Sequence, residues 1–170
     1  MAMKEGKVGL KDTRISPSGL NLLITEYITH QLSKISEKYP LNTINSDMYH
    51  FSRRLGQNIM LRVSDGPMTR TLDQSAVLKL IHDEFWRFIF GRKGENPNSQ
   101  GPSHVFFIDR DIELWTRVSG VKGEKEQQYV ELVRILISGL IEGAITLIGY
   151  RSNVKVKFSG HETKVEVHCF

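Results

Sequence analysis

Hydrophobic residues recur at helical spacing near the start of the chain. Between Ser16 and Pro40 they follow one another every three or four positions and cover about half of a helical wheel, more than the ~100° stripe that packing on one core requires. We therefore expect a first helix with more apolar surface than this chain alone can bury. The stripe consists of Leu20, Leu23, Ile24, Tyr27, Ile28, Leu32 and Ile35, and Leu22 lies on the opposite side.

A second amphipathic segment predicts a helix from about Ser46 to Ser64. Arginine and asparagine residues fall outside its apolar stripe, as expected for a helix with one buried face. The turn-forming sequence Asp65-Gly66-Pro67 ends this helix. Its apolar stripe consists of Ile44, Met48, Phe51, Leu55, Ile59 and Val63.

A third helix is predicted between Asp73 and Gly91. Asp73 is a favourable N-cap residue, and Gly91 is the residue type that most often ends a helix. The following residues, 92–103, include two glycines and two prolines, and we predict a loop there.

Apolar residues then alternate with polar ones, which is the spacing of strands. Residues 104–109 and 112–119 predict two strands that form a hairpin, and residues 154–158 and 164–170 predict two more. Each strand should have one dry and one wet face. Lys155 and Lys157 on one wet face and Glu166 on another would make favourable cross-strand pairs in a suitable register.

A long and almost wholly apolar helix is predicted from Glu124 to Tyr150. Its narrow polar strip holds Arg134 and Glu142, charges that a membrane-spanning segment of only 17 residues (132–148) would not tolerate. We therefore expect a buried central helix, with Gly139 and Gly143 at points of close approach to a neighbour.

The order of elements predicts an α+β fold. We expect helices packed on a twisted four-stranded antiparallel sheet, with the long helix buried, in a single domain of residues 16–170 after a flexible tail of residues 1–15. The length of 170 residues and the hydrophobic content of 39% suit one domain with a proper core.

The charge pattern limits the classes of partner that we expect for this chain. The net charge is +4 and the pI about 9.2, but the basic residues are scattered, so we expect no nucleic-acid partner and at most peripheral contact with a membrane surface. The single cysteine, Cys169, cannot form an internal disulfide, which favours a reducing, cytoplasmic location.

Candidate catalytic patterns are weak, and we expect no catalytic residue, no metal and no cofactor. The triplet His82-Asp83-Glu84 is interpreted as a solvated helix face, because consecutive helical residues point in different directions. His161-Glu162 begins like a zinc-protease motif, but Val165 stands where its second histidine belongs. The other candidate ligands are expected to remain apart in strands or loops: His104, His168 and Cys169.

Four segments in order resemble the small α/β subunit family of the TRAPP tethering complex. They are FSRRLGQNI (51–59), LKLIHDEFWRFIFG (78–91), HVFFIDRDIELWTRVSG (104–120) and LISGLIEGAITLIGYRSNVKVKF (136–158). The similarity extends from about Ser16 to Phe170 and consists mostly of packing residues. It implies a non-catalytic core subunit of an assembly that tethers COPII vesicles between the endoplasmic reticulum and the Golgi apparatus.

The resemblance also implies partners. Nucleotide exchange on a Rab GTPase would belong to the assembled complex, at the cytoplasmic side of endoplasmic reticulum and cis-Golgi membranes. Subunits of this shape form heterodimers with other TRAPP subunits through their first two helices, which fits the excess apolar surface. The expected interface residues are Leu23, Ile24, Tyr27, Ile28, Leu32, Ile35, Met48, Phe51, Leu55 and Ile59.

An alternative function is a small-molecule sensor of the same architecture that binds a lipid-like ligand or haem. Tyr150-Arg151-Ser152 partly matches the Tyr-x-Ser-x-Arg haem signature, but Val154 replaces the closing arginine. One relative in the TRAPP family carries an acylated cysteine in a hydrophobic channel, whereas this chain has no cysteine in its first 168 residues.

Overall fold

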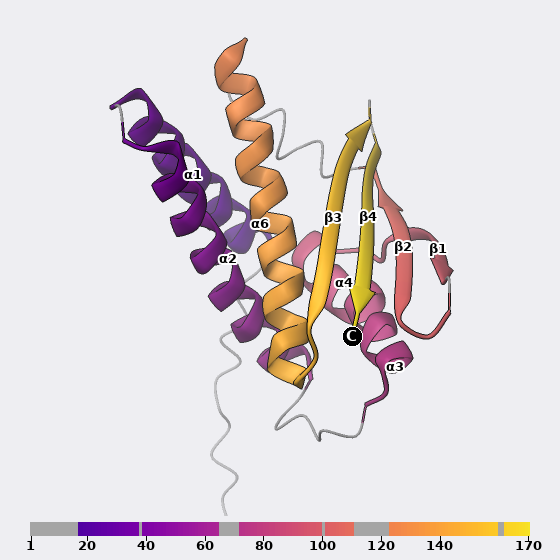
Figure 1. The fold of residues 1–170 in the computed structure, drawn as a ribbon. Coiled ribbons are helices and arrows are strands. Elements are labelled where there is room, and N and C mark those ends of the chain that lie inside the picture. Colours follow the sequence, from indigo (N-terminus) through magenta and orange to yellow (C-terminus); the bar gives the residue numbers. More distant parts are fainter. Residues whose placement is uncertain (1–16, 38, 65–71, 100, 111–122, 160–161) are drawn as a thin grey trace, which may run out of the picture.

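The computed structural model describes residues 17–37, 39–64, 72–99, 101–110, 123–159 and 162–170. Helices lie beside an antiparallel sheet, and α6 lies between α2 and β3 (Figure 1). The helical elements are α1 (Pro17–Ser36), α2 (Leu41–Val63), α3 (Gln74–Leu80), the π-helical turn η1 (Ile81–Phe85), α4 (Trp86–Phe90) and α6 (Glu124–Ile148). The strands are β1 (Glu95–Ser99), β2 (His104–Asp109), β3 (Ser152–Ser159) and β4 (Glu162–Cys169). The predicted α+β class is confirmed.

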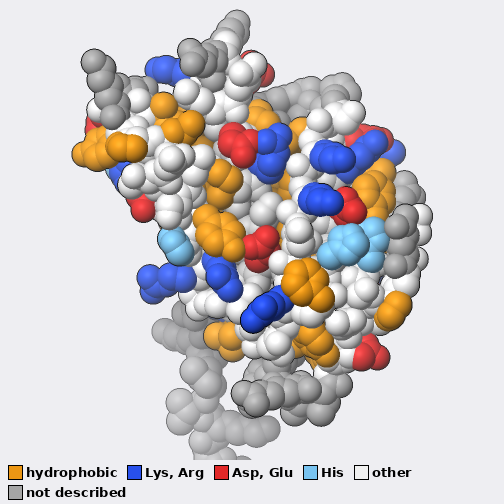
Figure 2. Space-filling view, in the orientation of Figure 1, with side chains coloured by type: hydrophobic (Ala, Val, Ile, Leu, Met, Phe, Trp, Pro, Cys, Tyr) orange, Lys and Arg blue, Asp and Glu red, His pale blue; other side chains and the backbone are white. Residues whose placement is uncertain are grey.

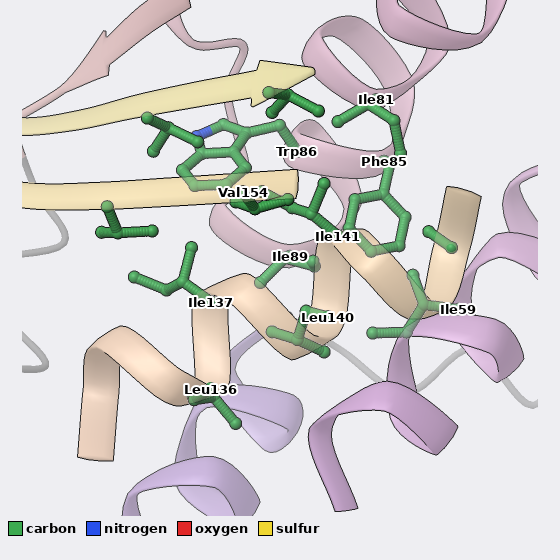
Figure 3. Close-up of a cluster of buried hydrophobic side chains, with 14 of the residues drawn as sticks. Ile59, Ile81, Phe85, Trp86, Ile89, Leu136, Ile137, Leu140, Ile141 and Val154 are labelled. Atoms are coloured by element: carbon green, nitrogen blue, oxygen red, sulfur yellow. The ribbon is translucent and has the colours of Figure 1, made fainter. Parts of the chain in front are cut away.

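The long helix α6 is the centre of the core, as predicted. It packs against α2 on one side and against β3 on the other. Its apolar side chains meet those of α2, η1, α4 and β3 in the cluster of Figure 3, which includes Ile59, Phe85, Trp86, Leu140, Ile141 and Val154. None of the described helices combines the length and hydropathy that a membrane crossing needs.

Helices α2 and α6 approach each other at glycines. A Cβ added at Gly143 would lie 2.1 Å from the carbonyl oxygen of Arg53, and one added at Gly139 would lie 2.0 Å from Oγ of Ser52. The prediction that Gly139 and Gly143 mark a close approach is therefore confirmed. Two side-chain hydrogen bonds join the same helices: Tyr49 donates to Oε2 of Glu142 at 2.5 Å, and Arg53 donates to Oγ1 of Thr146 at 3.2 Å.

The segment between Asp73 and Gly91 is helical, as predicted. The Asp73 carboxylate accepts from the Ala76 amide at 2.7 Å, and Gly91 ends the segment in the left-handed region with φ of 77°. The π-helical turn η1 lies in its middle and was not predicted. The interpretation of 82–84 as a solvated face is wrong for His82, which is buried, hydrogen-bonded through Nε2 to the Gly94 carbonyl and packed on the ring of Phe107.

Among the described residues the sheet has four antiparallel strands in the order β1-β2-β4-β3, which confirms the predicted four-stranded antiparallel sheet. The prediction of a loop over 92–103 is wrong, because β1 lies within it. Pro97 is tolerated there since β1 is an edge strand, and its pairing with β2 shifts register between Glu95 and Asn98. The strand predicted over 112–119 and the tail lie outside the described residues.

Helix α2 begins earlier than predicted. It starts at Leu41 rather than near Ser46, because Pro40 occupies the N-cap position and its carbonyl accepts from the amides of Thr43 and Ile44. Across β3 and β4, Lys155 is paired with Glu166, as the charge pattern predicted, while Lys157 is opposite Lys164.

Candidate partner interface on the first two helices

The ten residues predicted as an interface divide into two groups. One group is buried in this chain's own core, with exposed fractions of 9% or less. Part of the apolar stripe is therefore used internally, and these side chains are not available to a partner in this structure. The group consists of Ile24, Ile28 and Leu32 on α1 and Met48 and Ile59 on α2.

The second group lies toward the outside of α1 and α2. Leu23 is 52% exposed, while the side chains of Tyr27, Ile35, Phe51 and Leu55 are half-buried. The rings of Tyr27 and Phe51 stack across the two helices with centroids 3.8 Å apart and planes 17° apart. This contact holds the two helices in a fixed relation, and the interface role of this group stays a prediction.

A shallow hollow of about 440 Å³ lies between the same helices. Its apolar lining is formed by Tyr27, Phe51 and Leu55. Its polar lining comes from α2, where positions at three- and four-residue spacing share one face: Asp47, His50, Arg54 and Asn58. An apolar floor with a polar rim is the usual composition of a protein–protein contact.

The electrostatics of the hollow are mild. Burial raises the pKa of Tyr27; a hydrogen bond with Gln31 lowers it, and the Asp47 carboxylate raises it further, so that the phenol stays neutral at physiological pH. Asp47 also lies 3.9 Å from Nζ of Lys34 on α1. Asp47 is exposed and Lys34 is partly exposed, so these charges are suited to orient a partner more than to add affinity.

Sequence reasoning named Leu22 and Leu23, but it missed three other exposed apolar side chains on α2 and the turn before it: Tyr39, Leu41 and Leu61. Figure 2 shows hydrophobic side chains on the surface of the molecule over α1. A signal was present for Leu22 and Leu61, because each lies off the apolar stripe of its helix and so could not be buried by the core. The large apolar residues that are about half or more exposed here are Leu22, Leu23, Tyr39, Leu41 and Leu61.

The fold and this surface define a small α+β domain with a central buried helix and an incompletely covered helical face. Its sequence matches the profile of the family described as "Transport protein particle (TRAPP) component" over residues 20–169. The chain therefore belongs to the TRAPP component family, as its four sequence segments predicted. No curated relative matches it significantly in sequence.

A solved structure shares the fold. It is a trafficking protein particle complex subunit 3 from Naegleria fowleri, covalently bound to palmitic acid, and it superposes with a TM-score of 0.67 at 12% sequence identity. The similarity covers 88% of this chain and 95% of that one. At this identity the match establishes the architecture alone.

Proposed function

We propose that this chain is a non-catalytic core subunit of a TRAPP vesicle-tethering complex, of the type of its subunit 5, acting in transport from the endoplasmic reticulum to the Golgi apparatus. The family match over residues 20–169 carries the proposal. The apolar outer face of α1 and α2 supports it, because a component of an assembly needs such a surface.

The partner in this proposal is another TRAPP subunit, bound as a heterodimer through α1 and α2. Leu23, Tyr27, Phe51 and Leu55 would form the apolar centre, and Asp47 and Arg54 the polar rim. The stacked rings of Tyr27 and Phe51 favour binding because the surface is already ordered in the free chain, which reduces the entropy lost on association.

Rab GTPase exchange in this proposal belongs to the assembled complex, and the chain supports it as a scaffold on the cytoplasmic side of endoplasmic reticulum and cis-Golgi membranes. The net charge of +4 suits peripheral contact with an anionic surface. That contribution is about 1 kcal/mol for each correctly placed lysine or arginine, so membrane contact is secondary to subunit contacts.

The covalent palmitate of the Naegleria protein is not part of this proposal. The one cysteine of this chain, Cys169, is 2% exposed in β4, and burial raises the pKa of its thiol. A buried thiol with a raised pKa is a poor nucleophile, so Cys169 is unsuited to acylation in the folded chain.

Co-expression tests the proposed heterodimer. The chain and TRAPP subunits of the same organism are produced together, and light scattering measures the mass of the purified species. We expect a 1:1 heterodimer that Leu23→Asp disrupts. Ile28→Asp and Leu32→Asp, the changes that the apolar stripe suggested first, are unsuitable because both residues are core positions.

Phe170→Asp is the matched control. Phe170 is 63% exposed and, like Leu23, is a large apolar residue. It follows β4, which lies on the other side of α6 from α1 (Figure 1). It should leave the heterodimer intact. A heterodimer that survives Leu23→Asp in a folded chain would place the interface elsewhere, and a chain that stays monomeric with every TRAPP subunit would refute the proposed function.

A further inference from the structure

Three side chains with metal-ligating atoms meet on the outer face of the sheet. The antiparallel register of β2 and β4 places His104 directly opposite His168. Glu166 is two residues before His168 on β4, so both side chains lie on the same face. One ligand atom from each of these residues can be chosen so that the three atoms all lie within 4.8 Å of one another. In Figure 2 histidine side chains gather over the sheet, next to lysine and acidic side chains.

The separations between these atoms suit a tetrahedral centre. Nε2 of His104 lies 3.3 Å from Oε1 of Glu166, and Nε2 of His168 lies 3.4 Å from the same oxygen. With metal–ligand bonds of ~2.0–2.1 Å, neighbouring ligand atoms of a tetrahedral zinc centre lie ~3.4 Å apart. Two of the three required separations are therefore already present.

The two imidazole rings need only a modest rearrangement. They stack with centroids 3.9 Å apart and planes 19° apart, so the nitrogen lone pairs of the two rings lie in nearly parallel planes. The side chain of His168 is 46% exposed and can tilt until both Nε2 atoms point at one ion. His104 is held in place by its surroundings, since it is 8% exposed.

A second observation points to a ligand at the same place. Nε2 of His104 is buried and has no hydrogen-bond partner among the described residues. Oε1 of Glu166 is close to it, but the alignment does not make a hydrogen bond. Buried polar atoms without a partner are uncommon and unfavourable, and coordination to a cation would satisfy this one.

The carboxylate is in the charge state that a ligand needs. The ordinary pKa of a glutamate carboxyl lies well below neutral pH. Glu166 is therefore ionised at neutral pH. Lys155, its partner across β3 and β4, would compete with a bound cation and turn away from it.

We propose that His104, Glu166 and His168 bind one zinc ion, with the fourth position open to solvent. Two imidazoles and one carboxylate are a common zinc ligand set, and the open position is typical of centres that bind a water or an external ligand. Bound zinc would tie the C-terminal strand β4 to β2. The site is independent of the proposed heterodimer, because none of its residues lies on α1 or α2.

Calorimetric titration with zinc chloride tests this site. The full chain, freed of any histidine tag and stripped of metal with a chelator, should bind one equivalent of zinc at neutral pH. His168→Gln and Glu166→Gln should each weaken zinc binding at least about tenfold. Loss of a group that only orients a metal ligand already lowers the metal affinity by about that factor, and loss of the ligand itself should lower it no less. Both side chains are partly exposed, so without metal His168→Gln should keep the wild-type thermal unfolding midpoint. Glu166→Gln should lower that midpoint only slightly, because it loses the cross-strand pair with Lys155.

Two further measurements distinguish a built site from adventitious binding. His50→Gln removes an exposed histidine of α2 and should bind zinc like the wild type. Cobalt should give the visible absorption of a four-coordinate centre, and binding should weaken on acidification as the ligands take up protons. The proposal fails if the wild type does not bind zinc, or if His168→Gln and Glu166→Gln bind as tightly as His50→Gln.

Discussion

Gly56 on α2 faces the backbone of Leu140 on α6 so closely that a Cβ added at Gly56 would lie 2.0 Å from the Leu140 carbonyl oxygen. Gly143 makes the reciprocal approach from α6 to Arg53. The two helices therefore pack backbone to backbone, and this contact sets the position of α2 on the core. The candidate interface depends on it, because α2 supplies Phe51, Leu55 and the polar lining of that surface.

Gly56→Ala and Gly143→Ala should each destabilise the chain by about 1–3 kcal/mol, as forced overpacking does. The sign of the change in unfolding free energy is informative. In a helix without such a contact, alanine would stabilise the chain by about 0.8–1 kcal/mol relative to glycine. Urea unfolding measures the difference. Ser46→Ala, at an exposed position of α2, is the control and should change stability little.

The carboxylate of Asp109 joins α4 to β2. It is 1% exposed, accepts a hydrogen bond from Nε1 of Trp86 at 2.6 Å and forms an ion pair with Arg92. Asp109→Ala should cost about 3 kcal/mol, the lower end of the range for breaking a buried pair, because the Arg92 side chain is 33% exposed. Chemical unfolding monitored by Trp fluorescence tests this value. A loss no larger than that from Asp47→Ala on the surface would contradict it.

The fold should lose stability in acid partly through Asp83. Burial raises the pKa of Asp83, but Lys93, whose Nζ is 3.1 Å away, and His82 outweigh it, so that the pKa lies below the ordinary value of 3.8. The pKa of Asp83 is lower in the folded chain than in the unfolded chain. The ionised carboxylate therefore stabilises the fold at every pH above its ordinary pKa. The contribution is lost as the pH falls through the folded-state pKa.

Asp83→Asn provides the measurement. At about pH 7 the variant should be less stable than the wild type, and the difference should shrink on acidification toward about pH 3. Glu84→Gln, at the exposed neighbouring residue, should show a smaller effect at neutral pH. A difference between wild type and Asp83→Asn that does not depend on pH would show that the ion pair with Lys93 contributes nothing.

The thiol of Cys169 should be slow to react. The thiol is 2% exposed, and burial raises its pKa. A disulfide reagent that releases a coloured product should therefore react with Cys169 only when β4 opens locally. In urea the same thiol should react at the rate of a model peptide. Equal rates in the two conditions would mean that β4 is open in the native chain.

Local sequence signals predicted local structure well. Asp73 and Gly91 bound a helical segment because an N-cap carboxylate and a left-handed glycine act on their own neighbours. The close approach at Gly139 and Gly143 was also predictable. Glycine destabilises the interior of a helix, so two glycines there indicate that a neighbouring segment leaves no room for a side chain. The edge strand β1 was not predictable, since pairing with β2 outweighs the loop composition around Pro97.

The candidate sites depend on contacts between segments that are distant in the sequence, and these contacts could be predicted only in part. Periodicity identified the apolar stripe of α1, but it could not tell Ile28, which the core buries, from Leu23, which remains exposed. It also gave no register for β2 and β4, so His104 and His168 were expected to remain apart. The strand pairing brings them together.

The proposed role of this chain as a TRAPP subunit depends on the outer face of α1 and α2. The most direct measurement is purification of the full chain, tagged at its N-terminus, from cells of its own organism, followed by native mass spectrometry of the intact assembly. We predict recovery in a complex with other TRAPP components, and loss of those components with Leu23→Asp but not with Phe170→Asp. Recovery of the wild-type chain without any TRAPP component would contradict the proposed role.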